Sequence, residues 1–378
     1  MILSKIKYSE YEGENNSWYL EETELEKINL IVGNNASGKT RTINVIAGLA
    51  KILSGILNSL FDSGTYFAEF IDNADVYIYE LKLFNKNVVN ESLKINDEIK
   101  LERDQDGKCK IFAFQLNSFM DIKVPKNQLV AVIRRDEIQH PYLEKIYLWA
   151  YSMSHYQFGT PLGRESGLLI SDPKKINVDY RDNNQVTAMF LKGINDYGSD
   201  FENEIIKNMG IVGYMIDNIG VGPNPNVSIL APGGFPVHLL FAKETDRSNI
   251  TFQNEMSQGM FRVLSLLIQI AFFQKINIPS MIIIDDIGEG IDFDRSEHLI
   301  NLLITSIYDS PAQLIMSTND KFVMNNVALK YWQVIKRNNN ICKLYNYKNS
   351  ENIFKDFEFT GLSNFDFLAT KFYEKGLE

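Results

Sequence analysis

The feature that most constrains this chain is a glycine-rich loop between an apolar strand and a helix. The segment "GNNASGKT", residues 33–40, fits the pattern G-x-x-x-x-G-K-[ST] in full. Apolar "INLIV" precedes it, and "RTINVIAGLAKIL", with apolar residues at helical spacing, follows it. Glycines let successive backbone N–H groups turn toward one anion, and the N-terminus of the next helix adds partial positive charge. The loop therefore predicts a site for nucleotide phosphates.

The residues of this loop have different expected roles. Lys39 should reach the β- and γ-phosphates as a point charge, and Thr40 should place its hydroxyl on Mg²⁺. The residues predicted to contact the nucleotide here are Gly33, Asn34, Asn35, Ala36, Ser37, Gly38, Lys39, Thr40 and Arg41.

A second stretch, "MIIIDDIGEGID" at residues 281–292, ends an apolar run in acid. Asp285, at the end of the predicted strand, is expected to orient the Mg²⁺ hydration shell together with Thr40. Asp286 follows, where a carboxylate could accept a proton from an attacking water or hold that water in line. An ordinary strand-to-loop boundary would also carry two aspartates, but the phosphate loop favours the magnesium-nucleotide interpretation.

Two further segments add polar groups near predicted element ends. In "NEMSQGMFRVLSLLIQIAFF", the turn Ser257, Gln258, Gly259 directly precedes an apolar helix and could present a hydroxyl and backbone amides to an anion. A simple N-cap before a core helix gives the same pattern. Downstream, "LIMSTND" is a predicted strand that ends in polar residues, among them Asn319.

Strands and helices alternate after the middle of the chain, which predicts a parallel sheet in an α/β core. The alternating helix, strand, helix and strand are expected at 260–275, 280–284, 294–308 and 312–317. Before them, runs such as "DVYIYELKLF" predict an antiparallel layer, and "PYLEKIYLWAYSMSHYQF" has helical periodicity. We predict a core split between residues 1–74 and 246–378, with an antiparallel β layer and a helical insertion lobe at 75–245.

Composition excludes several classes of protein. A net charge of −10 argues against a surface that is basic all over and binds phosphate backbones. Local basic clusters, for which a solvated surface is the simpler explanation, contain Lys123, Lys126, Arg134 and Arg135, and Lys336, Arg337 and Lys343. The sequence contains no run of about twenty apolar residues without charge, so we predict no membrane span. The N-terminal segment lacks a secretory pattern, and two cysteines without metal-ligand spacing favour the cytoplasm.

Taken in order, these motifs resemble the soluble ABC-type ATPases of the SMC/RecF/OLD-like branch. The matching segments are a phosphate loop at 33–40, a signature-like turn at 257–259, a Walker B strand at 281–286, a D-loop-like turn at 288–292 and a switch-like segment at 316–320. The closing "STNDKFVMN" and "GLSNFDF" are similar to small bacterial anti-phage defence ATPases. The resemblance covers the first fifty and last 125 or so residues. It implies an ABC-type P-loop ATPase head with ATP and Mg²⁺ as cofactors.

The resemblance also implies a homodimer that sandwiches ATP. The phosphate loop of one copy would bind the phosphates, and Ser257 and Gly259 of the other would close over them. This chain departs from the family in carrying Asp286 where a catalytic glutamate is usual and Asn319 where a histidine is usual. Both changes imply slow hydrolysis, with Glu289 as an alternative general base. The glutamine loop is open among Gln115, Gln128 and Gln139.

The function that follows is an ATP-dependent switch whose dimer gates a separate effector or sensor protein, in the setting of anti-phage defence. After the switch-like segment about sixty residues remain, too few for a TOPRIM nuclease domain. The histidines show no metal-binding spacing: His140, His155, His238 and His298. The alternative is a RecF/SMC-like clamp that binds nucleic acid in DNA repair. The ATP-driving subunit of a membrane transporter fits the β-rich insertion poorly, so no membrane partner is expected.

Overall fold

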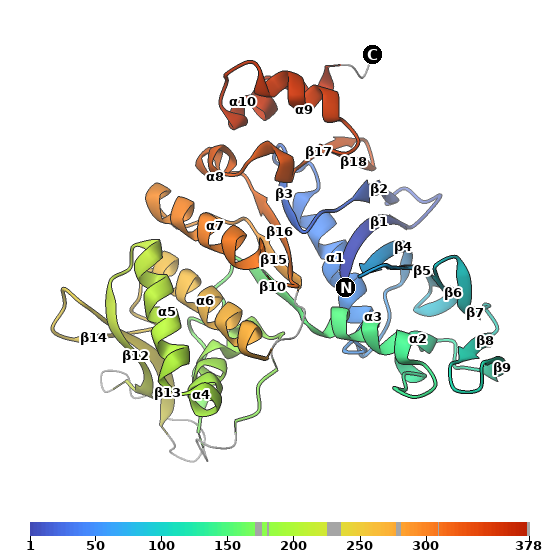
Figure 1. Cartoon of the computed structure of the whole chain (residues 1–378), viewed down its shortest axis with the longest axis horizontal. Coiled ribbons are helices and arrows are strands. Elements are labelled where there is room, and N and C mark those ends of the chain that lie inside the picture. Colours follow the sequence, from blue (N-terminus) through green and yellow to red (C-terminus); the bar gives the residue numbers. More distant parts are fainter. Residues whose placement is uncertain (171–175, 180, 225–235, 277–280, 309, 376–378) are drawn as a thin grey trace.

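The computed structural model describes residues 1–170, 176–179, 181–224, 236–276, 281–308 and 310–375. One sheet of fourteen strands runs through the molecule in the order β10-β15-β16-β3-β17-β18-β2-β1-β4-β5-β6-β7-β8-β9 (Figure 1). Its first five strands are parallel neighbours and form the centre of the molecule: β10 (Met153–Gln157), β15 (Met281–Asp285), β16 (Gln313–Thr318), β3 (Ile28–Val32) and β17 (Trp332–Asn338). This arrangement confirms the predicted α/β core.

The sequence of strand β15 is an unbroken apolar run up to Asp285 because both faces of the strand are buried. Ile282 and Ile284 face one hydrophobic core, and Met281 and Ile283 face the other. Helices cover both faces, which is the usual condition of a parallel sheet. On one face lie α1 (Lys39–Leu53) and α3 (Pro141–Tyr151), and on the other lie α6 (Gln258–Ile276) and α7 (Phe293–Tyr308) (Figure 1).

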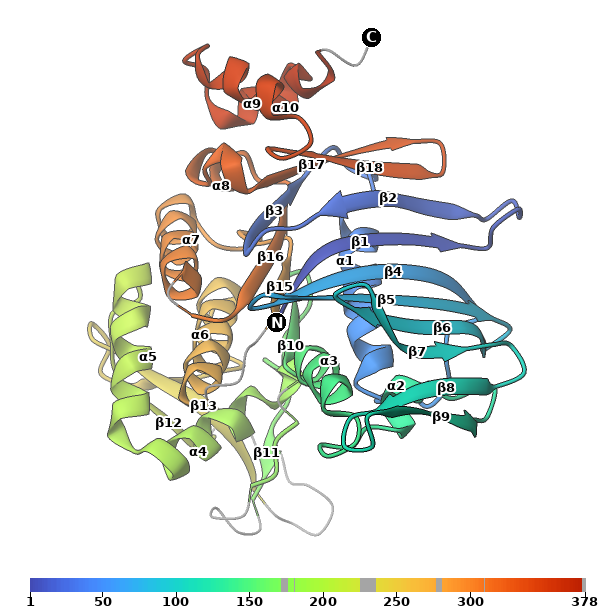
Figure 2. The same ribbon diagram turned by 45° about the vertical axis from the view of Figure 1, so that its right-hand side comes forward.

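The remaining strands form an antiparallel layer that continues the same sheet, except that β18 and β2 are parallel (Figure 2). They are β18 (Ile341–Asn346), β2 (Trp18–Glu24), β1 (Ile2–Glu10), β4 (Ser63–Asp72), β5 (Asp75–Phe84), β6 (Asn87–Ile95), β7 (Glu98–Arg103), β8 (Lys108–Ala113) and β9 (Ser118–Lys123). Apolar residues alternate along β4 and β5, so one face packs on α1 and α3. The predicted antiparallel layer is confirmed.

A buried ion pair fixes the chain that leaves this layer. Glu91 of β6 and Arg103 of β7 are fully buried, with a nitrogen and an oxygen 3.6 Å apart. Glu91 accepts hydrogen bonds from the backbone N–H groups of Val130 and Ala131 at 2.8 and 2.9 Å, which begins α2 (Val130–Ile133). Arg103 donates to three carbonyls between residues 125 and 128.

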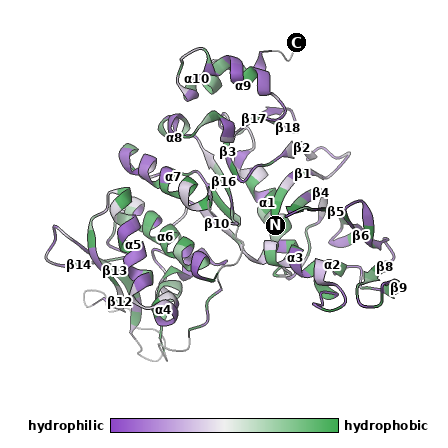
Figure 3. Ribbon diagram, viewed as in Figure 1, coloured by the Kyte–Doolittle hydropathy of each residue, from purple (hydrophilic) through white to green (hydrophobic). Residues whose placement is uncertain are grey.

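A lobe with its own small sheet packs on α6. The sheet contains β11 (Leu168–Leu169), β13 (Val237–Glu244), β12 (Ile216–Pro223) and β14 (Ile250–Phe252), and its helices are α4 (Val186–Tyr197) and α5 (Ser199–Val212). Phe201 of α5 meets Phe272 of α6 edge to face. Figure 3 shows hydrophilic stretches on α5, α7 and α9 (Glu351–Glu358). The short α8 (Lys321–Asn326) and α10 (Asn364–Ala369) complete the C-terminal part.

Helix α6 is the one helix of the described residues that is long and apolar enough to cross a membrane. Its tested window is 83% buried inside the protein, because α4, α5 and the parallel strands surround it. It is therefore the central helix of a core rather than a lipid-facing segment.

The structure corrects the sequence-based description of the middle of the chain. Helical periodicity predicted one element through "PYLEKIYLWAYSMSHYQF", but the helix ends at Tyr151 and β10 follows, because its backbone pairs with β15. Strand β10 belongs to the parallel core although it falls within the predicted insertion at 75–245. Strands β4 and β5, on either side of the predicted boundary at residue 75, pair along their whole length. Ser280, in the predicted strand 280–284, lies outside the described residues.

Candidate functional site

The phosphate loop lies where β3 ends and α1 begins. Gly38 has φ +106° and is the N-cap of α1, a left-handed backbone conformation that favours glycine. Gly33 leaves no room for a side chain, because an added Cβ would lie 2.8 Å from the carbonyl oxygen of Ile335 in β17. Lys39 is buried and donates hydrogen bonds to the carbonyls of Gly33 and Asn34 at 2.8 and 3.0 Å. The loop thus curls around its own lysine, and the predicted contact of Lys39 with phosphates stays a prediction.

The two predicted magnesium ligands meet beside this loop. Thr40 Oγ1 lies 3.4 Å from Asp285 Oδ1, although 245 residues separate them in the chain. Strands β3 and β15 are not neighbours, and β16 lies between them. Ser317 of β16 donates its hydroxyl hydrogen bond to Asp285 Oδ1 and accepts one from the Asp286 N–H at 3.0 Å. Ser317 is fully buried, so it orients both acidic residues; the sequence placed it at the polar end of a predicted strand but assigned it no role.

Asp286 has an unusual backbone and a perturbed carboxyl group. Its φ of +56° lies in the left-handed region, which aspartate tolerates better than most residues. Asn319 Nδ2 donates to Asp286 Oδ1 at 3.3 Å. The structure therefore brings together the two positions at which the chain departs from the ABC-type ATPases that it resembles. Burial raises the pKa of Asp286, and neighbouring Asp285 raises it further. Burial also lowers the pKa of Lys39, against the opposing pull of Asp286 and Asp285.

The structure identifies a glutamine that the sequence interpretation missed. Gln157, the last residue of β10, is in register with Asp285, and the N–H of Phe158 donates to the Asp285 carbonyl at 3.1 Å. The three candidates Gln115, Gln128 and Gln139 lie instead in loops of the antiparallel half, next to β8, β9 and α2. Only a correct assignment of "MSHYQ" as a strand could have found Gln157, since a residue at the carboxyl end of a parallel strand borders the ligand site.

The signature-like turn is not part of this cluster. Ser257 Oγ accepts a hydrogen bond from the Met260 N–H at 3.2 Å, as an N-cap serine does. In the described part of the chain, no hydrogen bond or ion pair joins residues 257–259 to residues 33–41. Gly259 packs instead against the Gly290 carbonyl, so closely that a Cβ would not fit. One protomer therefore assembles the phosphate loop and the acids but keeps Ser257 and Gln258 exposed elsewhere.

Glu289 lies in the D-loop-like turn between these two groups. Its backbone carbonyl accepts a hydrogen bond from Arg262 of α6 at 2.6 Å. Its side chain is exposed, and its charge adds to the rise in the pKa of Asp286. Asp286, rather than Glu289, holds the hydrogen-bonded position beside Asp285 and Asn319.

The signature-like turn is fastened to the segment that follows Gln157. Arg164 donates to the carbonyls of Asn254 and Met256 at 2.8 and 2.7 Å. Gln253 is fully buried and its side-chain amide donates to the carbonyls of Gly163 and Ser166. A shift of the chain after β10 would therefore move residues 253–257 with it.

Acidic side chains offset much of the positive charge in the basic clusters. Most of their members have an acidic partner: Lys126 with Asp106, Arg135 with Glu144, Lys336 with Glu374 and Lys343 with Glu21. Of the histidines, His155 lies in β10, where burial lowers its pKa to about 4. The paired lysines and arginines therefore have the features of surface residues, and His155 has those of a structural residue.

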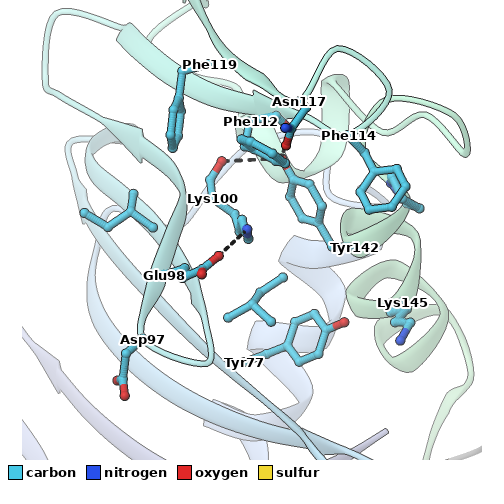
Figure 4. Close-up of a pocket in the computed structure, with 13 residues that line it drawn as sticks. Tyr77, Asp97, Glu98, Lys100, Phe112, Phe114, Asn117, Phe119, Tyr142 and Lys145 are labelled. Atoms are coloured by element: carbon cyan, nitrogen blue, oxygen red, sulfur yellow. Dashed lines mark hydrogen bonds and ion pairs between the residues drawn. The ribbon is translucent and has the colours of Figure 1, made fainter.

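A second concave surface lies in the antiparallel half and shares no residue with the phosphate loop (Figure 4). This hollow of about 940 Å³ is lined by aromatic rings that include Phe112, Phe119 and Tyr142. Its Lys100 is paired with Glu98, and its Lys145 with Asp72. Its chemistry is aromatic and charge-balanced, which does not suit a triphosphate.

Comparisons with known proteins identify a family and a fold. Residues 28–325 match the family described as "AAA domain, putative AbiEii toxin, Type IV TA system". No curated protein matches the chain. An SMC head bound to the C-winged helix domain of ScpA is similar in structure, with a TM-score of 0.54 and 12% identity over 91% of this chain and 97% of that one. That likeness confirms the predicted SMC-like head fold.

Two further solved structures are similar at lower scores. An Smc head with an extended coiled coil, bound to the C-terminal domain of ScpA from Pyrococcus furiosus, has 14% identity and a TM-score of 0.49, covering 94% of this chain and 99% of that one. The SMC head domain from Thermotoga maritima has 13% identity and a TM-score of 0.46, covering 92% and 99%.

Proposed function

Because residues 28–325 match its model, the chain belongs to this AAA-domain family, and its fold is similar to that of an SMC head. On that premise we propose that it is an ATP-dependent molecular switch. The observation that carries the proposal is the meeting of Thr40 and Asp285 beside the buried Lys39. A hydroxyl and a carboxylate from segments far apart in the chain converge at the mouth of a phosphate loop. That convergence is the oxygen environment that a magnesium-nucleotide complex needs.

The residues present fit Mg²⁺ and a nucleoside triphosphate. Hard oxygen donors are available on Thr40 and Asp285, and Gln157 adds an amide oxygen at the adjacent strand end. Bound Mg²⁺ would offset negative charge on the β- and γ-phosphates. Lys39, now bonded to two loop carbonyls, would turn its ammonium to the phosphates. The loop amides and the N-terminus of α1 would hold the same anion.

Hydrolysis would depend on Asp286 as the group that orients or deprotonates the attacking water. Its raised pKa makes it a better proton acceptor than an ordinary aspartate, but its side chain is one methylene shorter than a glutamate. Asn319 can hold Asp286 or a phosphate oxygen by hydrogen bonding but cannot take a proton. We therefore expect slow turnover and a long-lived ATP-bound state.

The exposed signature-like turn supports a dimer as the complete catalytic unit. Ser257 and Gln258 offer a hydroxyl, backbone amides and the N-terminus of α6, yet they do not reach the phosphate loop of their own copy. A second copy would bring them to the γ-phosphate, so ATP would join the protomers. We further propose that this dimer gates a partner protein, as in anti-phage defence; the matching family is described as a putative toxin of a Type IV TA system.

The test is equilibrium binding of ATP with Mg²⁺ by calorimetry, together with steady-state turnover. Lys39→Ala should weaken ATP binding by about 100-fold or more, because a buried charge-assisted contact to phosphate is lost. Lys126→Ala is the matched control, since this lysine is exposed and paired with Asp106 in the antiparallel half. Equal ATP affinity of Lys39→Ala and the unchanged protein would refute the nucleotide site.

The alternative of a nucleic-acid clamp has the SMC-like fold in its favour. The acidic partners of the basic clusters count against it. Filter binding with DNA and RNA of several lengths, with and without ATP, separates the two functions. An ATP-dependent affinity whose logarithm falls linearly with the logarithm of salt concentration would favour the clamp.

A further inference from the structure

Arg41 directly follows the phosphate loop, and its planar guanidinium lies over the ring of Trp18. Its guanidinium carbon lies 4.7 Å from the centre of the Trp18 ring. Trp18 is buried, and its ring lies against the loop, since a Cβ on Gly38 would come within 3.8 Å of it. Arg41 therefore covers the outer face of a tryptophan that supports the phosphate loop from behind.

The guanidinium is held in place and its charge is offset. Arg41 Nε donates to Glu10 Oε1 at 3.2 Å, and Nη2 forms an ion pair with the same oxygen. Glu10 is itself fixed by a hydrogen bond from the Tyr8 hydroxyl at 3.0 Å. About half of the Arg41 side chain, 45%, stays exposed. An arginine already paired with a carboxylate is a weaker clamp for phosphate but keeps its planar face.

A hollow opens beside this face. It has a volume of about 640 Å³, and Glu10, Tyr11, Arg41 and Asn44 are among the residues that line it. Arg41 follows Thr40, so the hollow starts where the phosphate loop ends. A nucleotide whose phosphates occupy the loop must place its ribose and base outside the loop, and this hollow adjoins the first turn of α1, directly after the loop.

We propose that the exposed face of Arg41 is the stacking platform for the nucleobase of the bound nucleotide, with Trp18 beneath it and Glu10 as its positioning residue. This assignment rests on the proposed nucleotide site and adds which part of the nucleotide Arg41 recognises. The guanidinium plane contacts the π-face of the base, while the loop alone binds the phosphates. The competing role for Arg41 is a direct ionic contact to phosphate.

The experiment compares ADP with inorganic pyrophosphate, which has no base, by titration calorimetry with Mg²⁺. Arg41→Gln should weaken ADP binding by about tenfold, the usual loss for one base–side-chain stack, and leave pyrophosphate within about twofold. Arg135→Gln is the matched control. Arg135 lies 3.3 Å from the centre of the Tyr147 ring and pairs with Glu144, but in the antiparallel half, so both affinities should be unchanged.

Arg41→Lys separates stacking from charge. Lysine keeps the positive charge but has no planar group, so ADP binding should stay as weak as in Arg41→Gln. Equal weakening of ADP and pyrophosphate by Arg41→Gln, or recovery of ADP affinity in Arg41→Lys, would overturn the platform in favour of a phosphate contact. If the unchanged protein binds neither ligand, the phosphate site itself fails; if it binds both equally well, only the base platform fails.

Discussion

Two acidic residues, one within the antiparallel half of the large sheet and one directly after a strand of its parallel half, differ in how the fold satisfies their charge. Glu91, in the antiparallel half, is fully buried and bonded to two backbone N–H groups, the Tyr79 hydroxyl and Arg103. Asp286, which follows β15 of the parallel half, is partly buried. Among the described residues, the one hydrogen bond to its carboxylate comes from Asn319 at 3.3 Å. Burial raises the pKa of both groups.

The difference separates a structural acid from one available for chemistry. The oxygens of Glu91 are occupied by protein donors, so they hold the start of α2 and have no capacity for a ligand. Asp286 keeps unused acceptor capacity, a left-handed backbone and a neighbouring negative charge. Such unfavourable features persist at functional sites, where a ligand or metal relieves them.

Glu91→Gln should have the largest effect on stability. The change leaves the guanidinium of Arg103 buried without its counter-charge, which should reduce the free energy of unfolding by about 3–5 kcal/mol. Urea denaturation measures it. Glu98→Gln is the control, since the Glu98 side chain is mostly exposed and pairs with Lys100 in the same layer. A loss below about 1 kcal/mol, the value of a surface pair, would contradict the structural role of Glu91.

Asp286→Asn should have the largest effect on turnover. The amide cannot accept a proton from water, so ATP hydrolysis should fall by about 100-fold or more while ATP binding persists. Steady-state phosphate release and calorimetry measure the two quantities. Glu289→Gln tests the other candidate base and should leave turnover within about threefold, because only its backbone carbonyl is tied into the site. If Glu289→Gln abolishes turnover and Asp286→Asn does not, the roles are reversed.

Local patterns in the sequence were sufficient for the phosphate loop, because every residue of that motif is contiguous and its strand and helix flank it. The structure also brings Thr40 to Asp285 and Asn319 to Asp286, since carboxyl ends of parallel strands share one edge, while the roles of these residues stay predictions. Gln157 was missed because its strand is short and depends on pairing with β15, which outweighs the helical periodicity of the preceding residues.

Ser317 and Arg164 show a different limit of sequence reasoning. Ser317 acts through the register of β16 against β15, and Arg164 through carbonyls ninety residues away, neither of which has a local signature. The predicted division at residues 75 and 245 stays a prediction about domains. The fourteen-stranded sheet crosses both parts, because strand pairing is set by the whole chain and not by changes in composition.

Arg164→Ala should uncouple the signature-like turn from the strand end that carries Gln157. Three hydrogen bonds to the carbonyls of Asn254 and Met256 are lost. Turnover should fall by about tenfold with ADP affinity within about twofold, since the phosphate loop is untouched. Arg247→Ala, which removes an exposed arginine from the same lobe, is the control. A parallel loss of ADP affinity would show that Arg164 supports the fold rather than the coupling.

The pH dependence of turnover is a smaller effect that sharpens the same comparison. Asp286 is active as a carboxylate, and its raised pKa means that it becomes protonated at a higher pH than an ordinary aspartate. Turnover should therefore decline, as pH falls, at values above the ordinary aspartate pKa of 3.8. A pH profile of kcat/KM for ATP, which reports groups of the nucleotide-free protein, measures it, with Glu289→Gln as the matched variant. A decline in turnover that begins only at or below pH 3.8 would contradict the role of Asp286 as the proton acceptor.

The smallest expected effect is a gain in stability from Asp286→Asn without nucleotide. The pKa of Asp286 is higher in the folded than in the unfolded state, so folding is favoured below the unfolded value and this contribution is lost as pH rises through the folded value. At neutral pH the carboxylate therefore destabilises the fold, by less than about 1 kcal/mol because it is partly exposed to solvent. Asparagine removes that charge and tolerates the left-handed backbone.

Urea denaturation at neutral pH should show the gain, and at about pH 3, where both states carry a neutral acid, the gain should vanish. If Asp286→Asn and the unchanged protein have the same free energy of unfolding at both pH values, the ionised carboxylate does not destabilise the fold. Asp286 would then be as well satisfied as Glu91.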